Sequence, residues 1–296
     1  MINYICLPDT RAKRIEITST TSETKEMKNK IICSTGTSIG RENNCDYRIM
    51  ADIAPKLDCD GFELMMLRAY YDCLDDIPSF FRNTGMKFPV IHADKQIGDL
   101  ISKNEDGDAN EAIRRFRLNC KLGADMNCER IVLHLWGGVA SDKTIQLNID
   151  FAEILLPIAK EYGLRLTVEN IPCVIADPLS HWKVLAERYD ELDFIFDTRF
   201  GGFHTQLEQV IADGWLSTRV KHMHVSDFTG PPKDFTTLRP ILHPGEGIVD
   251  LDTFFKNAAP VYDGTITLES PVIREDGTLD IEKLNNSLKY IRKQVN

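Results

Sequence analysis

Eight short apolar runs alternate with longer amphipathic segments from residue 30 to the end of the chain. The apolar runs have the length of buried strands, and in the segments between them apolar residues recur every three or four positions, as in helices packed on a sheet. Such alternation predicts βαβ units with a parallel sheet, and eight units predict a single closed (β/α)8 TIM barrel. The predicted strands span residues 30–34, 59–66, 87–93, 129–135, 165–170, 193–197, 219–225 and 265–270.

Helical patterns fill the segments between these strands, and Gly123, Gly163 and Gly214 stand where helix C-caps are expected. A doubly wound open sheet is the alternative fold, but no glycine-rich phosphate-binding pattern follows the first strand. No linker-like or repeated segment divides residues 27–296, so we expect one catalytic barrel domain. The predicted helices span residues 45–57, 74–85, 110–124, 144–163, 179–189, 206–214, 249–259 and 281–294.

The first 26 residues are rich in Ser, Thr and charge and lack the apolar core of a secretion signal. We expect residues 1–26 to form an N-terminal extension outside the barrel, disordered or an upstream translation artefact, with Met27 as a natural start. The eight cysteines include no CxxC pair, which favours free thiols in a reducing compartment. The sequence therefore predicts a cytoplasmic protein.

The overall charge and the lengths of the apolar runs argue against two classes of partner. A formal net charge of -10 opposes nucleic acid, because phosphate backbones are bound chiefly by clustered Lys and Arg. No apolar run approaches the roughly 18 residues that a membrane span needs. We expect neither a nucleic-acid nor a membrane partner, and a homo-oligomer is compatible with the sequence.

Four of the predicted strands end at residues that bind metal ions. The runs RLTVE, DFIFD, VKHMH and TITLE end at Glu169, Asp197, His224 and Glu269. Barrels build their active sites at the carboxyl ends of strands, so these side chains should meet at one mouth. Three carboxylates and one imidazole with little basic compensation repel one another unless a cation lies between them.

A structural polar cluster is the alternative to a metal site. Two Glu, one Asp and one His form a hard, oxygen-rich ligand set, which favours one divalent Mn²⁺, Mg²⁺ or Co²⁺ ion, with Zn²⁺ also able to bind. Coordination positions would remain open for substrate oxygens. We expect Glu169 and Glu269 to act as acid and base in addition to binding the metal.

The chain resembles the xylose isomerase-like TIM barrels, which include sugar phosphate isomerases and epimerases, inosose dehydratases and type IV apurinic endonucleases. The resemblance covers nearly all of residues 28–295. It rests on DGFEL (60–64), VIHAD (90–94), VLHLWGG (132–138), TVEN (167–170), FDT (196–198), VKHMHVSD (220–227), HPGEGIVD (243–250) and TLES (267–270).

The resemblance implies the same four metal ligands and adds His92 and His134 as strand-end histidines facing the same mouth. The endonuclease pattern calls for a histidine three residues after the strand-6 aspartate and an aspartate two residues before the loop histidine. This chain has Phe200 and Ile241 there, so the three-metal cluster of an endonuclease lacks two ligands. The resemblance together with the acidic charge disfavours DNA repair.

The ketose 3-epimerase branch matches at the metal site but not in the sugar pocket. Its sugar-holding glutamate, histidine and arginine are replaced by Ile175, Phe200 and Gly230. The pattern therefore does not distinguish among a sugar, a sugar phosphate and a polyol derivative as the substrate.

Several other residues are candidates for substrate binding. Trp136 follows a strand end, where an aromatic ring walls a sugar pocket or simply packs. Lys233 lies in the long loop after the seventh strand, and His243 resembles the loop histidine of the family. His222 lies one layer below His224 on the same face of its strand, where we expect it to orient its neighbours.

These observations predict a metal-dependent isomerase or epimerase of a sugar or polyol derivative that stabilises an enediolate. A keto-polyol dehydratase of the inosose type is the second hypothesis, since it begins with the same deprotonation. A barrel that binds metal or sugar without turnover is the third.

Overall fold

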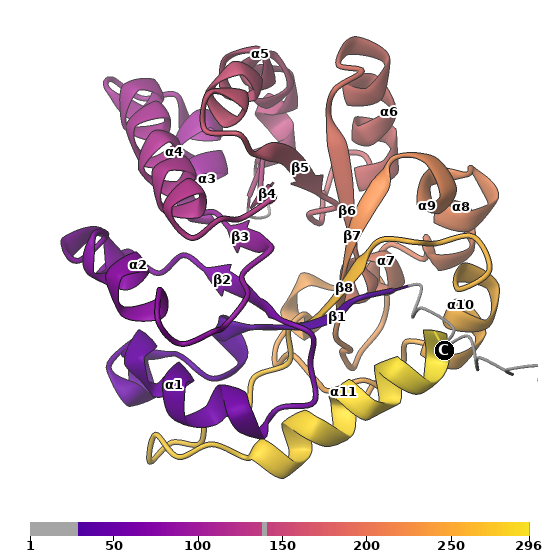
Figure 1. Ribbon diagram of the computed structural model, residues 1–296. Helices are drawn as coiled ribbons and strands as arrows, with labels where there is room; N and C mark the ends of the chain where they lie inside the picture. The colour runs from indigo at the N-terminus through magenta and orange to yellow at the C-terminus, as the bar shows by residue number, and fades with distance from the viewer. Residues whose placement is uncertain (1–28, 138–140, 296) are drawn as a thin grey trace, which may run out of the picture.

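The computed structural model describes residues 29–137 and 141–295. Its eight strands form one closed parallel barrel in the order β1 to β8, and Figure 1 shows the helices arranged around it. The prediction of a single (β/α)8 barrel is confirmed. The strands are β1 (Ile31–Ser34), β2 (Phe62–Met65), β3 (Val90–His92), β4 (Arg130–Leu133), β5 (Arg165–Glu169), β6 (Asp193–Asp197), β7 (Val220–Val225) and β8 (Thr265–Leu268).

Helices connect successive strands, and several shorter turns extend the loops. The α-helices are α1 (Met50–Ile53), α2 (Asp76–Phe81), α3 (Gln96–Lys103), α4 (Asp108–Asp125), α5 (Ile145–Glu161), α6 (Pro178–Arg188), α7 (Thr198–Phe203), α8 (Leu207–Ala212), α9 (Trp215–Thr218), α10 (Leu251–Ala258) and α11 (Ile281–Val295). The 3-10 turns are Thr35–Thr37, Arg41–Asn43, Tyr47–Ile49, Ala54–Lys56, Arg68–Asp72, Ser141–Thr144 and Phe235–Thr237.

Each predicted strand is present, whereas the helices differ in three respects. The predicted helix 45–57 is broken into α1 and two 3-10 turns around Pro55, which cannot supply a helical N–H. Helices α3, α7 and α9 were not predicted. Gly123 is no C-cap: it lies inside α4, where a Cβ would come within 2.8 Å of Ile91 Cγ2, so glycine allows close packing of α4 on β3. Gly163 does take the left-handed conformation expected after a helix, with φ 73°.

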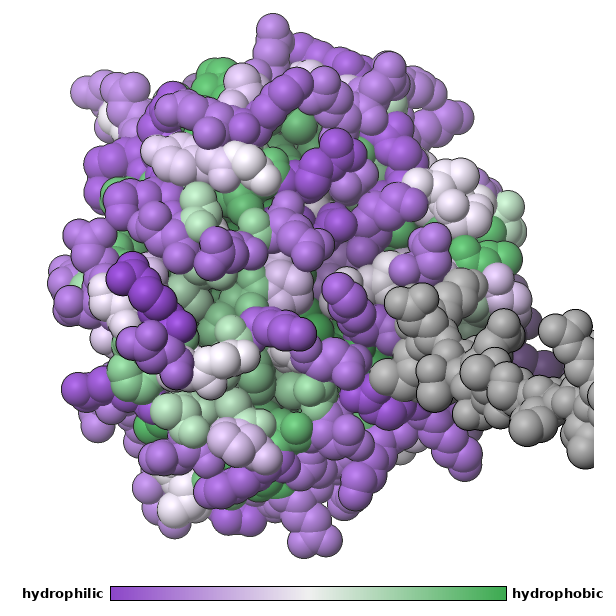
Figure 2. All heavy atoms as spheres, viewed as in Figure 1, coloured by the Kyte–Doolittle hydropathy of each residue, from purple (hydrophilic) through white to green (hydrophobic). Residues whose placement is uncertain are grey.

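The apolar core lies mainly between the barrel and its helices. A small separate cluster fills the barrel interior near the amino ends of the strands and consists of Ile32, Val90, Val132 and Ile195. Above it the interior is polar, because β2, β5 and β7 point Glu63, Glu169 and two histidines inward. Figure 2 shows hydrophilic residues over most of one face of the molecule, with hydrophobic residues in a hollow near its centre.

Other sequence expectations bear on the environment of the chain. All described cysteines are free thiols. No helix in the described part of the chain is both long enough and apolar enough to cross a membrane. The predicted N-terminal extension, residues 1–26, lies outside the described residues.

Candidate metal centre

The four predicted ligands meet at the carboxyl end of the barrel. Glu169 and Asp197 are the last residues of β5 and β6, His224 lies near the end of β7, and Glu269 directly follows β8. One ligand atom from each of the four lies within 4.8 Å of the others. Three of the side chains are buried and Glu269 is nearly so, so one strand-end position in each of four elements builds a single compact site.

His224 is held between carboxylates on both sides of its ring. Its Nδ1 lies 3.2 Å from Glu169 Oε1 and 3.4 Å from Glu269 Oε2, and its Nε2 lies 3.0 Å from Glu63 Oε2. With its Nε2 proton donated to Glu63, His224 directs Nδ1 at the other ligands, and metal binding would displace the proton on that nitrogen. A carboxylate behind the imidazole fixes the tautomer and orientation that a metal ligand needs.

Glu63 is the residue of this site that the sequence analysis missed. Its Oε2 also lies 2.6 Å from His222 Nε2, which in turn is 3.0 Å from Thr267 Oγ1. His222 therefore lies one layer below His224, at the position expected from strand alternation. A carboxylate in the otherwise apolar run FELM was the available signal, since an inward glutamate on a buried strand needs a partner.

The two carboxylate oxygens of Asp197 have different environments. Its Oδ1 accepts the Phe200 N–H at 2.9 Å and caps α7, while its backbone N–H donates to Asn170 Oδ1. Its Oδ2 is buried without a hydrogen-bond partner among the described residues, as is Glu269 Oε1. Buried carboxylate oxygens are rarely left unpaired, so these two atoms fit a site built for a cation.

The side chains of the cluster have pKa values that are shifted in different directions. Burial raises the pKa of Glu169, but its electrostatic and hydrogen-bond interactions with His134 and His224 outweigh burial and hold this pKa well below its usual value. Burial lowers the pKa of His224, yet the surrounding carboxylates outweigh it and hold the pKa well above the usual value. Burial raises the pKa of Asp197 to about 6, since the nearby glutamates add to desolvation and the charge of Arg199 offsets only part of it. Such opposite shifts in pKa are expected where several carboxylates are buried close together.

His92 and His134 lie against the same cluster. His92 Nε2 is 3.4 Å and His134 Nε2 is 2.7 Å from Glu169 Oε2, and the two rings meet edge to face with centroids 4.9 Å apart. Burial lowers the pKa of His134 to about 4, so its imidazole is neutral at pH 7. Both histidines can therefore orient Glu169 or contact a substrate oxygen beside it.

The remaining candidate residues form hydrogen bonds to residues other than the four ligands. Trp136 is fully buried and donates to the Ile171 carbonyl, so it packs behind the loop after β5. His243 Nδ1 lies 2.7 Å from Ser287 Oγ on α11, and its Nε2 lies 3.2 Å from the Pro271 carbonyl oxygen. Lys233 is exposed, and its backbone N–H donates to Phe203.

A second group with metal-type ligands lies behind the loop after β5. Asp142, Cys173 and His181 bring ligand atoms within 4.8 Å of one another. Asp142 Oδ2 already accepts the N–H groups of Ile175 and Ala176, at 2.7 and 3.1 Å. These bonds give Asp142 a structural role in shaping the loop.

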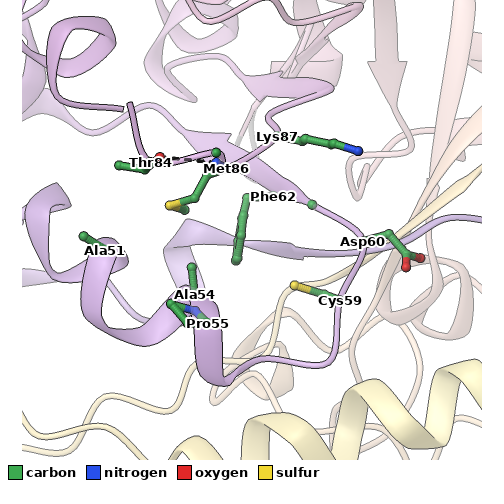
Figure 3. Close-up of a pocket in the computed structure, with 11 residues that line it drawn as sticks. Ala51, Ala54, Pro55, Cys59, Asp60, Phe62, Thr84, Met86 and Lys87 are labelled. Carbon is green, nitrogen blue, oxygen red and sulfur yellow. Dashed lines mark hydrogen bonds between the residues drawn. The ribbon is translucent and has the colours of Figure 1, made fainter. Parts of the chain in front are cut away.

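Two cavities mark opposite ends of the barrel. One, of about 540 Å³, opens beside Glu269 and is lined by the carboxyl ends of β1 and β2 and by the loops after β3 and β7. The other, of about 420 Å³, lies at the amino end of β2, and Figure 3 shows Phe62 and Met86 lining it beside Asp60. Asp60 accepts the Ile31 N–H at 2.8 Å and so holds β1 in place. Barrel sites are built at the carboxyl ends, so the cavity beside Glu269 is the candidate substrate space.

Comparisons with known proteins agree with the fold. A family model described as a xylose isomerase-like TIM barrel matches residues 51–294. A search of curated proteins gives no match.

Solved structures share the fold at low sequence identity. The IOLI protein with a bound zinc atom is 18% identical, with a TM-score of 0.68 over 90% of this chain and 98% of its own. D-allulose 3-epimerase from Methylomonas sp. in complex with D-allulose is 12% identical, with a TM-score of 0.70 over 90% and 97%. The 3-keto-D-glucoside 4-epimerase from E. coli is 16% identical, with a TM-score of 0.64 over 90% and 99%.

Proposed function

The chain belongs to the xylose isomerase-like TIM barrel family, and we propose on that premise that it is a metal-dependent isomerase or epimerase of a sugar or polyol derivative. Residues 27–296 form its catalytic domain in this proposal. Structural neighbours include a D-allulose 3-epimerase and a 3-keto-D-glucoside 4-epimerase, which supports this class of reaction.

The observation that carries the proposal is the convergence of Glu169, Asp197, His224 and Glu269 within 4.8 Å of one another. Asp197 Oδ2 and Glu269 Oε1 are buried oxygens that have no hydrogen-bond partner in the described part of the chain. Placing three carboxylates together in a barrel interior is costly without a cation. A divalent ion, with Mn²⁺, Mg²⁺ or Co²⁺ as the first choices, fits these four ligands.

A bound divalent ion would supply Lewis-acid stabilisation of negative charge on substrate oxygens. The residues of the chain supply the proton transfer. Glu169 is ionised at neutral pH, because its pKa is held well below the usual value, and it can accept a proton from the carbon next to a carbonyl. Glu269 belongs to the same cluster and lines the cavity of about 540 Å³, so it faces the space that a substrate would occupy.

The two glutamates account for either reaction of this class. In epimerisation, one removes the proton and the other returns it on the opposite face of the carbon. In isomerisation, a single glutamate transfers the proton between neighbouring carbons on one face. His134, neutral at pH 7, is placed to donate its Nε2–H to Glu169 Oε2 at 2.7 Å and so to hold that base in position.

Heavy water distinguishes these reactions. The Mn²⁺-loaded protein is incubated in D₂O with ketoses, ketose phosphates and inososes, and each mixture is followed by NMR. An isomerase or epimerase places deuterium on the carbon next to the carbonyl and forms an isomer. A dehydratase releases a hydroxyl and consumes its substrate. Absence of both exchange and conversion across the set, with metal bound, would contradict the proposed activity.

A further inference from the structure

The cavity beside Glu269 carries a charge opposite to that of the whole protein. Four basic side chains line it and come from four separate segments: Arg41 and Arg68 from the 3-10 turns after β1 and β2, Lys95 from the loop after β3, and Arg239 from the loop after β7. The chain as a whole has a formal net charge of -10. A concave site lined by one sign of charge concentrates ligands of the other sign.

These four side chains are not neutralised by the protein. No ion pair or side-chain hydrogen bond forms at any of them within residues 29–137 and 141–295. By contrast, arginines on the outer helices pair with carboxylates: Arg114 with Glu111 at 2.7 Å and Arg117 with Glu161 at 2.8 Å. The cationic groups of the cavity are therefore available to a ligand.

The acidic residues that line the cavity do not cancel this charge. Asp94 is already paired, since its Oδ2 accepts Arg115 Nη1 and the Tyr71 hydroxyl, each at 3.0 Å. Its Oδ1 accepts the Gln96 N–H at 3.0 Å. Glu269 is one of the four ligands of the candidate metal centre. The lining of the cavity thus keeps a net positive charge, and it includes one of the candidate metal ligands, Glu269.

Arg239 has a further basic neighbour. Arg199 is almost fully buried, donates to the Leu238 carbonyl at 3.0 Å, and lies over the Phe200 ring at 4.3 Å from its centroid. Burial lowers the pKa of Arg239, and the charge of Arg199 lowers it further, while Glu269 has the opposite effect. Arg199 already has an anion nearby, since its Nη2 lies 4.0 Å from Asp197 Oδ2, whereas Arg239 forms no ion pair in the described part of the chain. Phe200 stands at the position where the ketose 3-epimerase pattern has a sugar-holding histidine.

We propose that the substrate of this barrel is a phosphomonoester of a sugar or polyol, with its phosphate held by Arg239, Arg68, Arg41 and Lys95 and its reactive end turned toward Glu269. This inference rests on the proposed function, because it assigns a substrate class to the same site. A phosphate monoester carries nearly two negative charges and three acceptor oxygens, and arginine binds it through two parallel hydrogen bonds. A cavity of about 540 Å³ has the size of an ordinary small-molecule site.

Equilibrium binding tests the inference separately from turnover. The Mg²⁺-loaded full chain is titrated by calorimetry with D-ribulose 5-phosphate, D-fructose 6-phosphate, D-fructose, D-glucuronate and inorganic phosphate. We expect a sugar phosphate to bind at least about tenfold more tightly than D-fructose. Arg239→Gln and Arg68→Gln should each weaken sugar phosphate binding by about tenfold, with little effect on D-fructose. Arg82→Gln is the matched control, since Arg82 is an exposed arginine outside the cavity.

Three outcomes would overturn the inference: D-fructose binding as tightly as the sugar phosphates, D-glucuronate binding in preference to them, or Arg239→Gln behaving like Arg82→Gln. A lack of binding by all the phosphates would also overturn it. The two proposals fail separately. Tight, arginine-dependent sugar phosphate binding without proton exchange in D₂O would contradict only the isomerase or epimerase activity, whereas conversion of neutral sugars alone would contradict only the phosphate site.

Discussion

Glu63 determines how His224 faces the candidate metal centre. Its Oε2 lies within hydrogen-bonding distance of His224 Nε2 and His222 Nε2, at 3.0 and 2.6 Å, from the opposite side of the barrel interior. An ionised carboxylate accepts from both imidazoles, so His224 keeps its Nε2 proton, and Nδ1 is the nitrogen that would lose its proton when a metal ion binds. Glu63 is therefore a positioning residue that acts through His224.

Replacing Glu63 by Gln should weaken metal binding while the four ligands stay in place. The amide offers one oxygen acceptor and no negative charge, so it no longer imposes the same tautomer on His224. Loss of such a supporting carboxylate typically costs about 10- to 100-fold in metal affinity. Calorimetric titration with Mn²⁺ measures the effect, with Glu187→Gln on the exposed side of α6 as the control. An unchanged affinity would contradict the role assigned to Glu63.

Glu169→Gln and Glu269→Gln should each lower turnover by about 10²-fold or more, because glutamine keeps much of the side-chain shape but cannot take a proton. Steady-state kinetics on the substrate found in the heavy-water experiment measure kcat, and the metal content of each variant is measured alongside. Full turnover by either metal-loaded variant would exclude that glutamate as an acid or base.

His204 should make the protein less stable as the pH falls from about 6.5 to about 4. Burial, aided by the charge of Lys233, lowers the pKa of His204 to about 4, and its Nε2 accepts the Cys173 N–H at 3.1 Å. Between those pH values His204 binds a proton in the unfolded chain but not in the folded protein, so the free energy of unfolding decreases as the pH falls.

Urea unfolding measured across this pH range checks the effect of His204. His204→Gln keeps an acceptor for the Cys173 N–H but does not titrate, so its stability should depend less steeply on pH, by up to about 1.4 kcal/mol per pH unit. Equal slopes for the variant and the parent protein would show that His204 is not the group responsible.

At the scale of elements, the loop between β7 and α10 is organised by one buried carboxylate. Asp227 Oδ2 accepts the N–H groups of Gly245 and Gly247 at 3.2 and 2.9 Å, and its Oδ1 accepts that of Val249 at 3.0 Å. Its backbone forms an antiparallel bridge with Leu242. A side chain that accepts several backbone N–H groups belongs inside the loop, and Asp227 is fully buried.

Asp227→Ala should destabilise the protein by about 3 kcal/mol or more, since it leaves buried N–H groups without an acceptor. The same change should speed amide exchange at Gly245, Gly247 and Val249, which hydrogen exchange resolves residue by residue. Asp234→Ala is the control in the same loop, because Asp234 accepts only from the neighbouring Thr236 and is mostly solvated. Comparable losses in the two variants would contradict this account of the loop.

At the scale of the whole molecule, the barrel could be predicted because each strand and the residue at its end form a local pattern. Glu169, Asp197, His224 and Glu269 each close an apolar run, and the closed barrel brings these ends together. Local patterns do not encode contacts across the barrel, which is why Glu63 and its pairing with His222, 159 positions away, escaped prediction.

The helices missed by the sequence analysis have similar physical explanations. Helix α7 contains Gly201 and Gly202, which are poor helix formers, and depends on Asp197 to cap its first turn. Helix α3 ends at Lys103 and is followed by Asn104 in a left-handed conformation. It is only eight residues long and lies shortly before α4, so its apolar periodicity is hard to distinguish from that of α4. Likewise, the sequence did not show that Trp136 would be buried, because that depends on how the loop after β5 folds over it.

The central claim is that four strand ends hold one metal ion, and anomalous diffraction from Mn²⁺-soaked crystals tests it most directly. We predict one strong anomalous peak at roughly 2 to 2.5 Å from oxygen or nitrogen atoms of Glu169, Asp197, His224 and Glu269. The peak should vanish in Asp197→Ala. A peak at Asp142, Cys173 and His181 instead, or no peak at the barrel mouth in crystals fully exchanged with Mn²⁺, would contradict the account.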